Sequence, residues 1–97
     1  MKLTRTQYQD ILKTLTEFNI AQEKLSLVKK KGRIKLHIEG IDSTFEFFKR
    51  KSVSLTEEDH QWLQSELYEV NAAGKTSVVA NWNEVISLLR KWLKAAI

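Results

Sequence analysis

Two basic runs are the part of this chain best suited to binding chemistry. The first lies within LVKKKGRIK and the second within FKRK, and together they contain Lys29, Lys30, Lys31, Arg33, Lys35, Lys49, Arg50 and Lys51. Ammonium and guanidinium groups gathered on one surface bind phosphates, or the carboxylates of an acidic protein. Charges of this density also keep the end of a β-hairpin in water and prevent aggregation. The runs therefore predict either a site for an anionic partner or a solvated hairpin end.

Phe48 places an aromatic ring directly before the second basic run. Beside Lys35 on a solvent-facing sheet, this ring would combine base stacking with a phosphate contact, as single-strand binders do. Such a stacking surface normally offers more than one ring, so the alternative is that Phe48 is covered by a helix, a terminus or a partner subunit. We expect the covered arrangement.

Catalytic and metal chemistry has few candidate residues. The chain has no cysteine, and its two histidines have no metal-ligand spacing. His37 is expected to reach Glu46 across two strands, but no nucleophile or oxyanion donor is identifiable near the pair. Asp59 and His60 are neighbours on a predicted helix and point about 100° apart, so they cannot act as a base and its orienting carboxylate. We therefore expect no enzyme, no metal and no cofactor.

The segment Gly74-Lys75-Thr76-Ser77 matches the end of a phosphate-binding loop. The full pattern requires a second glycine five positions before Gly74, after a strand, whereas this chain has Glu69 there inside a predicted helix. Without the glycine-rich arc, the backbone amides cannot surround a phosphate. We interpret the segment as a loop between two helices.

The C-terminal segment has the apolar spacing of an amphipathic helix, which is predicted to begin near Ser77 or Asn81. One stripe of this helix contains Val78, Trp82, Val85, Ile86, Leu89, Leu93 and Ala96. Leu88 and Trp92 widen the stripe to roughly half of the circumference, at about 100° per residue. Tryptophan is a common anchor of interfaces, so this edge is a candidate protein interface. The alternative is that both edges face neighbouring helices.

Two further segments are predicted to be helical. The first carries Tyr8, Ile11, Leu12, Leu15 and Phe18 on one face. Thr4 or Thr6 is expected to cap it, and Asn19 to end it. The second is expected over residues 55–71, with acidic residues in its first turn and Gly74 as its C-terminal stop.

Between these helices, residues 25–50 alternate apolar and polar side chains with the period of β-strands. Turns are predicted at Lys31-Gly32 and at residues 40–43. The resulting register pairs Leu27 with Leu36, Leu25 with Ile38, Leu36 with Phe47, and Ile38 with Phe45. All of these apolar side chains then share one face of a three-stranded meander.

This register also makes predictions for the polar side of the sheet. It places Arg33 opposite Lys30 and near Arg50, so that the two basic runs meet at one end of the sheet. It aligns His37 with Glu46, and Lys35 with Phe48.

Composition sets the remaining limits. A length of 97 residues with 42% hydrophobic residues fits one domain over residues 1–97, and a net charge of +4 is modest. The charge is uneven, because residues 24–51 hold nine Lys and Arg against three acids, whereas residues 52–74 hold five acids and no base. The N-terminus lacks a signal-peptide apolar region, and no stretch is long enough to span a bilayer. We expect a soluble, cytoplasmic protein.

Together these patterns predict a small α+β domain. A helix is followed by a three-stranded antiparallel β-meander and then by two helices packed on one face of the sheet. The predicted function is a non-enzymatic binding module that acts through a protein partner or through a homodimer, using the basic sheet end and the Leu88 and Trp92 edge. The alternative is sequence-nonspecific nucleic-acid binding through the basic end. No small-molecule substrate and no membrane partner is indicated.

Overall fold

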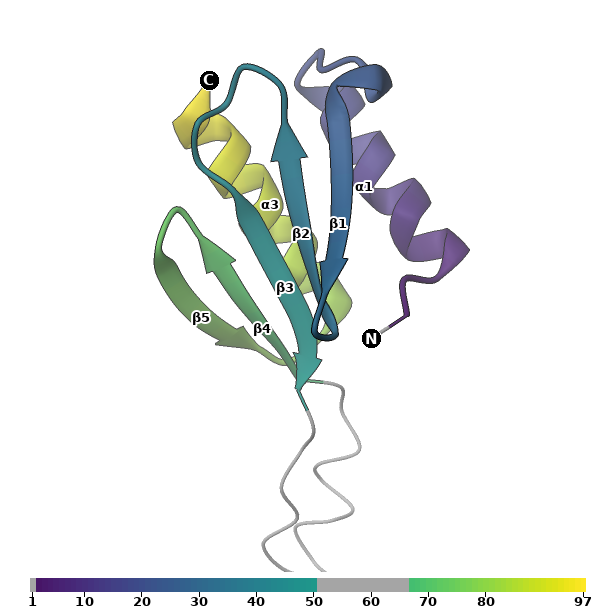
Figure 1. Cartoon of the computed structure of the whole chain (residues 1–97), viewed down its shortest axis with the longest axis vertical. Helices are drawn as coiled ribbons and strands as arrows, with labels where there is room; N and C mark the ends of the chain where they lie inside the picture. The colour runs from purple at the N-terminus through teal and green to yellow at the C-terminus, as the bar shows by residue number, and fades with distance from the viewer. Residues whose placement is uncertain (1, 51–66) are drawn as a thin grey trace, which may run out of the picture.

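The computed structural model describes residues 2–50 and 67–97. In these ranges the chain forms one five-stranded antiparallel sheet and two α-helices (Figure 1). The elements in chain order are α1 (Arg5–Glu17), the 3-10 turn η1 (Gln22–Lys24), β1 (Leu25–Lys30), β2 (Arg33–Ile38), β3 (Phe45–Arg50), β4 (Leu67–Ala72), β5 (Lys75–Val79) and α3 (Trp82–Ala96). The spatial order of the strands, β1-β2-β3-β4-β5, is their order in the sequence. The sheet is therefore a meander without crossovers.

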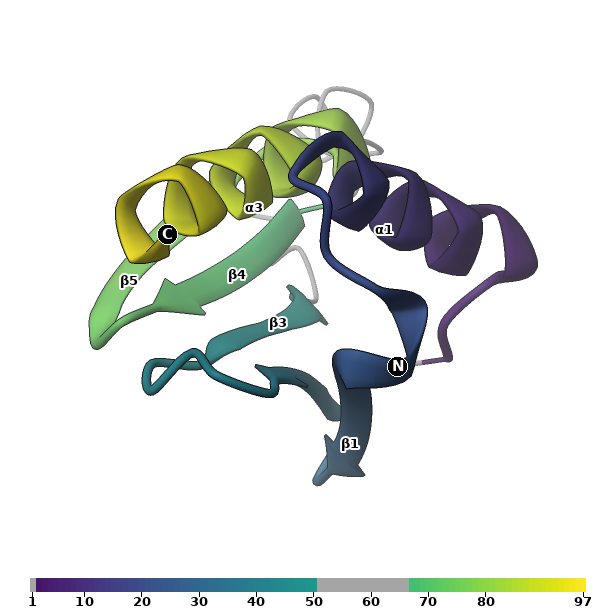
Figure 2. The same cartoon turned by 90° about the horizontal axis from the view of Figure 1, so that it is seen from above.

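The described elements form two layers. Both helices lie on the same face of the sheet, and no helix of the described ranges lies on the opposite face (Figure 2). The core between the layers consists of Ile11, Leu15, Ile34, Leu36, Ile38, Phe45, Phe47, Tyr68, Val70, Val85, Ile86, Leu89, Trp92 and Leu93. The α+β class and the packing of helices on one face of an antiparallel sheet agree with the prediction.

Both helices begin at side-chain caps that the sequence indicates. The Thr4 hydroxyl accepts a hydrogen bond from the Gln7 amide, and the Gln7 side chain accepts one from the Thr4 amide, which completes a capping box. The Asn81 side chain accepts a hydrogen bond from the Glu84 amide at 3.0 Å and caps α3. Of the two candidate starts for each helix, Thr4 and Asn81 are correct. Asn19, the predicted stop of α1, has a φ of 57°, which ends the helix.

The β1–β2 hairpin has the predicted register, with Leu27 opposite Leu36 and Leu25 opposite Ile38. Its turn residues, Lys31 and Gly32, have φ values of 52° and 78°. Positive φ at both central residues is the signature of a type I′ turn, whose twist matches that of the flanking strands.

The predicted β2–β3 register is wrong by two residues. Phe47 lies opposite Ile34, and Phe45 lies opposite Leu36. The reason is local: the Ile38 carbonyl accepts a hydrogen bond from the Ile41 amide, so the backbone at Ile38 already enters the loop and is not paired with β3. A shift of two residues keeps each side chain on its face of the sheet, so the apolar face is still correct.

The helix predicted over residues 55–71 is wrong in its last part. Residues Leu67–Ala72 form β4, and residues 55–66 lie outside the described ranges. In β4, Tyr68 and Val70 are buried and alternate with half-buried residues, which is the period of a strand. Helical spacing of Leu67 and Val70 is compatible with this short segment too, so the pattern alone is ambiguous.

The segment from Gly74 to Ser77 also differs from its predicted structure. Ala73 and Gly74, with φ values of 54° and 84°, form a second type I′ turn between β4 and β5. Gly74 is therefore a hairpin residue and not a helix stop, and the predicted loop between helices is the β4–β5 hairpin. Val78, expected on the helical stripe, lies in β5 with 49% of its surface exposed. The meander consequently has five strands where three were predicted.

None of the helices in the described ranges combines the length and the apolar character that crossing a bilayer requires.

Candidate functional site

The described residues of the two basic runs lie toward one end of the sheet, as predicted. The turn of the β1–β2 hairpin and the C-terminal end of β3 are both at this end (Figure 1). Lys30 lies opposite Arg33, as expected. Lys29, Lys31, Lys35 and Lys49 are exposed, whereas Lys51 lies outside the described ranges. The sequence thus located the basic end correctly, but not the neighbours of its arginines.

Arg33 and Arg50 are engaged by side chains on neighbouring strands. Arg33 Nη1 donates a hydrogen bond to Glu46 Oε1 at 3.0 Å, and Arg50 Nη1 lies 3.9 Å from Glu69 Oε1. Arg33 was expected near Arg50, but its guanidinium carbon lies 4.6 Å from the centre of the Phe48 ring. The two-residue shift of β3 explains this change of neighbour. Both guanidinium charges are therefore partly neutralised by carboxylates on the open face of the sheet.

Phe48 is half-buried on the open face and pairs with Glu69 of β4. Lys35, predicted beside Phe48, lies opposite Glu46 instead. The Arg33 guanidinium occupies one face of the Phe48 ring and forms a cation–π contact with it. Among the described residues, an arginine thus covers part of the ring.

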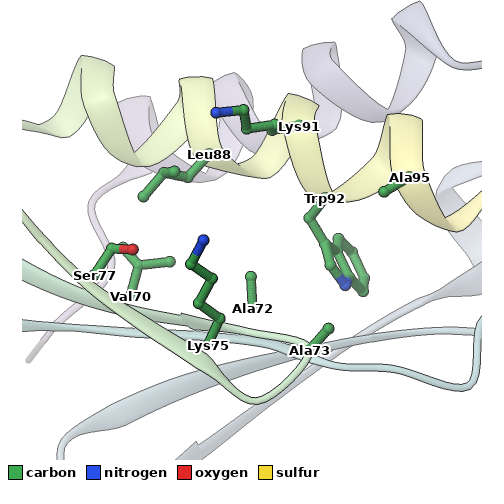
Figure 3. A pocket seen from close by; sticks show the side chains of 9 residues that line it. All are labelled: Val70, Ala72, Ala73, Lys75, Ser77, Leu88, Lys91, Trp92 and Ala95. Atoms are coloured by element: carbon green, nitrogen blue, oxygen red, sulfur yellow. The ribbon is translucent and has the colours of Figure 1, made fainter.

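Trp92 and Leu88 lie on the side of α3 that faces the β4–β5 hairpin (Figure 3). Trp92 is buried, and its indole Nε1 donates a hydrogen bond of 2.9 Å to Ser43 Oγ. Its ring also packs against Phe45, with 5.7 Å between the ring centres. Leu88, one turn earlier, is only half-buried. The predicted edge thus divides into a fixed aromatic ring and a partly accessible leucine.

Between α3 and the hairpin lies an open groove with a volume of about 310 Å³. Its lining residues are Val70, Ala72, Ala73, Lys75, Ser77, Leu88, Lys91, Trp92 and Ala95 (Figure 3). The hairpin contributes small side chains, Ala72 and Ser77, to the groove, and small side chains leave space beneath α3. Its walls are largely apolar, and its charged lining residues, Lys75 and Lys91, are both positive.

Leu88 separates this groove from a second hollow on the other side of α3. The second hollow has a volume of about 420 Å³ and is lined by Phe18, Ser87, Leu88, Arg90, Lys91 and Lys94. Leu88 and Lys91 therefore belong to both. The partly accessible apolar surface extends from the β4–β5 hairpin across α3 to the end of α1, with basic residues along its border.

An ion pair holds the two helices together next to this surface. Arg90 Nε and Nη2 donate hydrogen bonds to the two carboxylate oxygens of Glu17, at 2.9 and 3.2 Å. The hydrogen bonds from Arg90 lower the pKa of Glu17 below its ordinary value of 4.5, and those same bonds raise the pKa of Arg90. Arg90 is therefore a structural contact of α1 and α3 as well as a lining residue.

The structure separates several residues that the sequence suggested for metal, acid–base or phosphate chemistry. No three His, Cys, Asp or Glu side chains in residues 2–50 and 67–97 are close enough to hold a metal ion. His37 lies opposite Ser26, and Glu46 lies opposite Lys35, so the predicted pairing of His37 with Glu46 is not formed through the register. The Gly74 amide donates a hydrogen bond to Asn71 Oδ1, so it serves the hairpin and not a phosphate. Asp59 and His60 lie outside the described ranges.

The sequence identified the helical wall of the groove but not its floor. The sequence predicts Val70 in a helix and Ser77 in a loop between helices, so it does not predict their position beneath Leu88. The available signal was the alternation of Tyr68, Val70 and Ala72 immediately before Gly74.

No protein-family model, curated protein or solved structure matches this chain. The function is therefore inferred from the geometry of the chain itself.

Proposed function

We propose that this protein is a small non-enzymatic module that binds another protein through the groove between α3 and the β4–β5 hairpin. The observation that carries the proposal is the half-buried Leu88 next to the fixed ring of Trp92, above a floor of Val70 and Ala72. A ready-made apolar hollow of this kind accepts a side chain of a partner without rearranging the domain.

The size of the groove favours a protein side chain over a whole metabolite. Its 310 Å³ lies at the lower end of the range of roughly 300–1,000 Å³ that small-molecule pockets cover, and it is open to solvent. Burying one Leu or Phe side chain contributes about 1.5–3 kcal/mol, whereas micromolar affinity requires about 8 kcal/mol. A partner must therefore make contacts beyond the groove.

Self-association is the second form of the same function. A second copy of the chain could insert a side chain into the groove in the same way as a foreign partner. Sedimentation velocity over a range of concentrations distinguishes the two forms: a monomer at all concentrations supports a foreign partner, and a concentration-dependent dimer that Leu88→Asp dissociates supports self-association.

Nucleic-acid binding through the basic end is less well supported by the described contacts. A phosphate would compete with Glu46 for Arg33 and with Glu69 for Arg50, and it would find the Phe48 ring already in contact with a guanidinium. The exposed lysines of the hairpin remain, but they alone provide no base readout.

The experiment that tests the proposal is a selection of random peptides displayed on phage against the whole immobilised chain. The Leu88→Asp variant serves for counter-selection, because it places a charge in the apolar groove. Asn83→Asp is the matched control, since Asn83 is exposed on the same helix and outside the groove. We expect peptides that bind the wild type and Asn83→Asp but not Leu88→Asp. The proposal fails if no peptide depends on Leu88 while the circular dichroism spectra of all three proteins agree.

A further inference from the structure

One edge of the sheet lies directly beside the groove. β5 pairs with β4 on one side, and no strand of the described ranges pairs with its other side (Figure 1). An unpaired strand edge presents a row of backbone donors and acceptors to which another chain can add. The edge and the groove are therefore two parts of one surface.

The β4–β5 register shows which backbone groups of β5 are directed outward. The turn at Ala73 and Gly74 is a two-residue loop, so the flanking pair Ala72 and Lys75 is the first hydrogen-bonded pair of the ladder. Because hydrogen-bonded and non-hydrogen-bonded pairs alternate, the amides and carbonyls of Thr76 and Val78 point away from β4. A strand added beside β5 would pair with these two residues.

The two open edges of the sheet differ in their protection. β1 carries Lys29 and Lys30, and charged side chains of this kind discourage strand addition. β5 begins with its one charged residue, Lys75. The remaining residues of the strand are uncharged: Thr76, Ser77, Val78 and Val79. The edge next to the groove is therefore the less protected of the two.

The side chains of an added strand would alternate between the two faces of the sheet. Those on the helix face would lie next to Ser77 and Lys75 of β5. They would therefore be at the entrance of the groove, which Leu88 also lines (Figure 3). An apolar side chain at such a position would reach the groove, while backbone pairing would supply the additional contacts that one buried side chain cannot.

The charges at the groove indicate the composition of this segment. Both charged lining residues are lysines, and neither forms an ion pair with another residue of the described ranges at 4.0 Å or less. In Figure 3, Lys75 rises from the hairpin toward α3, and Lys91 lies on the helix above it. A segment with carboxylates next to its apolar side chain is complementary to this border.

From these three features we propose that an extended, acidic segment of a partner protein adds to the edge of β5 as a sixth strand and inserts an apolar side chain into the groove. This inference rests on the proposed function and specifies the conformation and charge of the partner segment. The backbone of Thr76 and Val78 provides affinity, Leu88 and Trp92 receive the side chain, and Lys75 and Lys91 select acidic sequences.

The test uses the whole chain and the peptides recovered in the selection described above. Val78→Pro removes an amide that points to the open edge and leaves the ladder to β4 intact. Val78→Ala is its matched control, because it keeps the amide and changes only a side chain on the face opposite the groove. We expect Val78→Pro to weaken peptide binding by about tenfold or more, and Val78→Ala to leave it unchanged within about twofold. Fluorescence anisotropy of labelled peptides measures both.

Two further readouts use folded proteins with an intact β5. Bound peptide should slow amide hydrogen exchange at Thr76 and Val78 in the wild type, which decides the matter if Val78→Pro does not fold. Replacing Lys75 and Lys91 together by Glu should change the selected peptides from acidic to basic.

The possible failures are distinguishable. Leu88-dependent peptides that leave exchange at Thr76 and Val78 unchanged overturn strand addition but preserve the proposed function. Peptides without an excess of Asp and Glu overturn the acidic composition. A dimer held together through the same two amides overturns the foreign partner in favour of a second copy. If no peptide depends on Leu88, both proposals fail.

Discussion

The indole Nε1 of Trp92 lies 2.9 Å from Oγ of Ser43, and this hydrogen bond joins α3 to the loop between β2 and β3. The same tryptophan also forms part of the wall of the groove between α3 and the β4–β5 hairpin. Ser43 is not a lining residue, yet it holds the edge of the ring that does line the groove. The shape of the candidate site therefore depends on a loop outside it.

Replacing Ser43 by Ala should lower the free energy of unfolding, and it should leave the Trp92 ring held less firmly in the wall of the groove. The substitution removes the Ser43 hydroxyl, so the Trp92 indole N–H is left without this acceptor, at a cost of about 1 kcal/mol in the free energy of unfolding. Urea denaturation followed by tryptophan fluorescence measures the loss. Ser87→Ala is the control, since the Ser87 hydroxyl donates to a carbonyl of its own helix and should change stability by less than about 0.5 kcal/mol. Equal effects of the two substitutions would contradict this role of Ser43.

Leu88 and Leu89 are neighbours in sequence with different predicted roles. Leu89 is 1% exposed in the core, so Leu89→Ala should lower the free energy of unfolding by about 2–5 kcal/mol. Leu88→Ala should cost no more than about 1 kcal/mol, because this side chain is only half-buried. The same pair should show the opposite order in binding, with Leu88→Ala reducing peptide affinity. Thermal unfolding of both variants, together with peptide titration, decides this. A larger loss of stability from Leu88→Ala than from Leu89→Ala would contradict the assignment of Leu88 to binding and of Leu89 to the core.

The contact between Glu17 and Arg90 predicts a pH dependence of stability. Since the pKa of Glu17 is lowered in the folded state by the hydrogen bonds from Arg90, its contribution is fully present above the ordinary value of 4.5. The contribution is lost as the pH falls through the lower, folded-state pKa. Wild type should therefore be slightly more stable than Arg90→Gln at neutral pH, and the difference should vanish in acid. Because the pair is exposed, added salt should also reduce it. Urea denaturation of both proteins at a series of pH values measures this difference in stability. A difference that increases as the pH falls would contradict the prediction.

Ala73 occupies a left-handed backbone position, with a φ of 54°, in the turn between β4 and β5. An alanine pays a steric cost there, whereas Asn-Gly is the preferred pair for a type I′ turn. Ala73→Asn should therefore raise the free energy of unfolding by up to about 1 kcal/mol, because Asn tolerates the left-handed conformation that costs other residues roughly 1–2 kcal/mol. Ala73→Val is the contrasting variant, since a β-branched side chain at positive φ should destabilise the hairpin. Differential scanning calorimetry of the two variants should shift the melting temperature in opposite directions.

The basic end should bind nucleic acids only weakly at physiological salt. Fluorescence anisotropy with single-stranded DNA, duplex DNA and duplex RNA compares the wild type with a variant in which Lys30, Arg33 and Arg50 are changed to Ser. We expect no micromolar binding by either protein, because carboxylates already engage both arginines. Micromolar affinity that falls steeply with salt and disappears in the variant would establish a phosphate site and favour the nucleic-acid alternative.

The elements that sequence analysis located correctly carry strong local signals. The β1–β2 hairpin has a Lys-Gly turn between two alternating segments, and this alone determines the opposition of Leu27 and Leu36. α1 and α3 have polar caps followed by long apolar stripes. Such features depend on neighbouring residues in the chain, so they are visible without knowledge of the tertiary structure.

The parts that were missed depend on contacts between distant segments. Leu67 and Val70 have helical spacing as well as lying in an alternating segment, and the pairing of β4 with β3 decides in favour of the strand. The β2–β3 register depends on where the backbone turns after Ile38, which hydrophobic alternation does not specify within two residues. The groove required both the hairpin and α3, so sequence alone provided Leu88 and Trp92 but not the surface opposite them.

The order of the strands has a consequence for how the protein folds. Every pair in the sheet joins strands that are consecutive along the chain. The β1–β2 and β4–β5 hairpins close through two-residue turns and can form early, whereas 16 residues (51–66) separate β3 from β4, and the entropy cost of closing a loop grows with its length. The contacts between α1 and α3, such as Glu17 with Arg90, join opposite ends of the chain and carry the largest loop-closure entropy. Docking of the two helices on a preformed sheet should therefore be the slow step of folding, and the groove, which needs α3 in place, should be among the last features to appear.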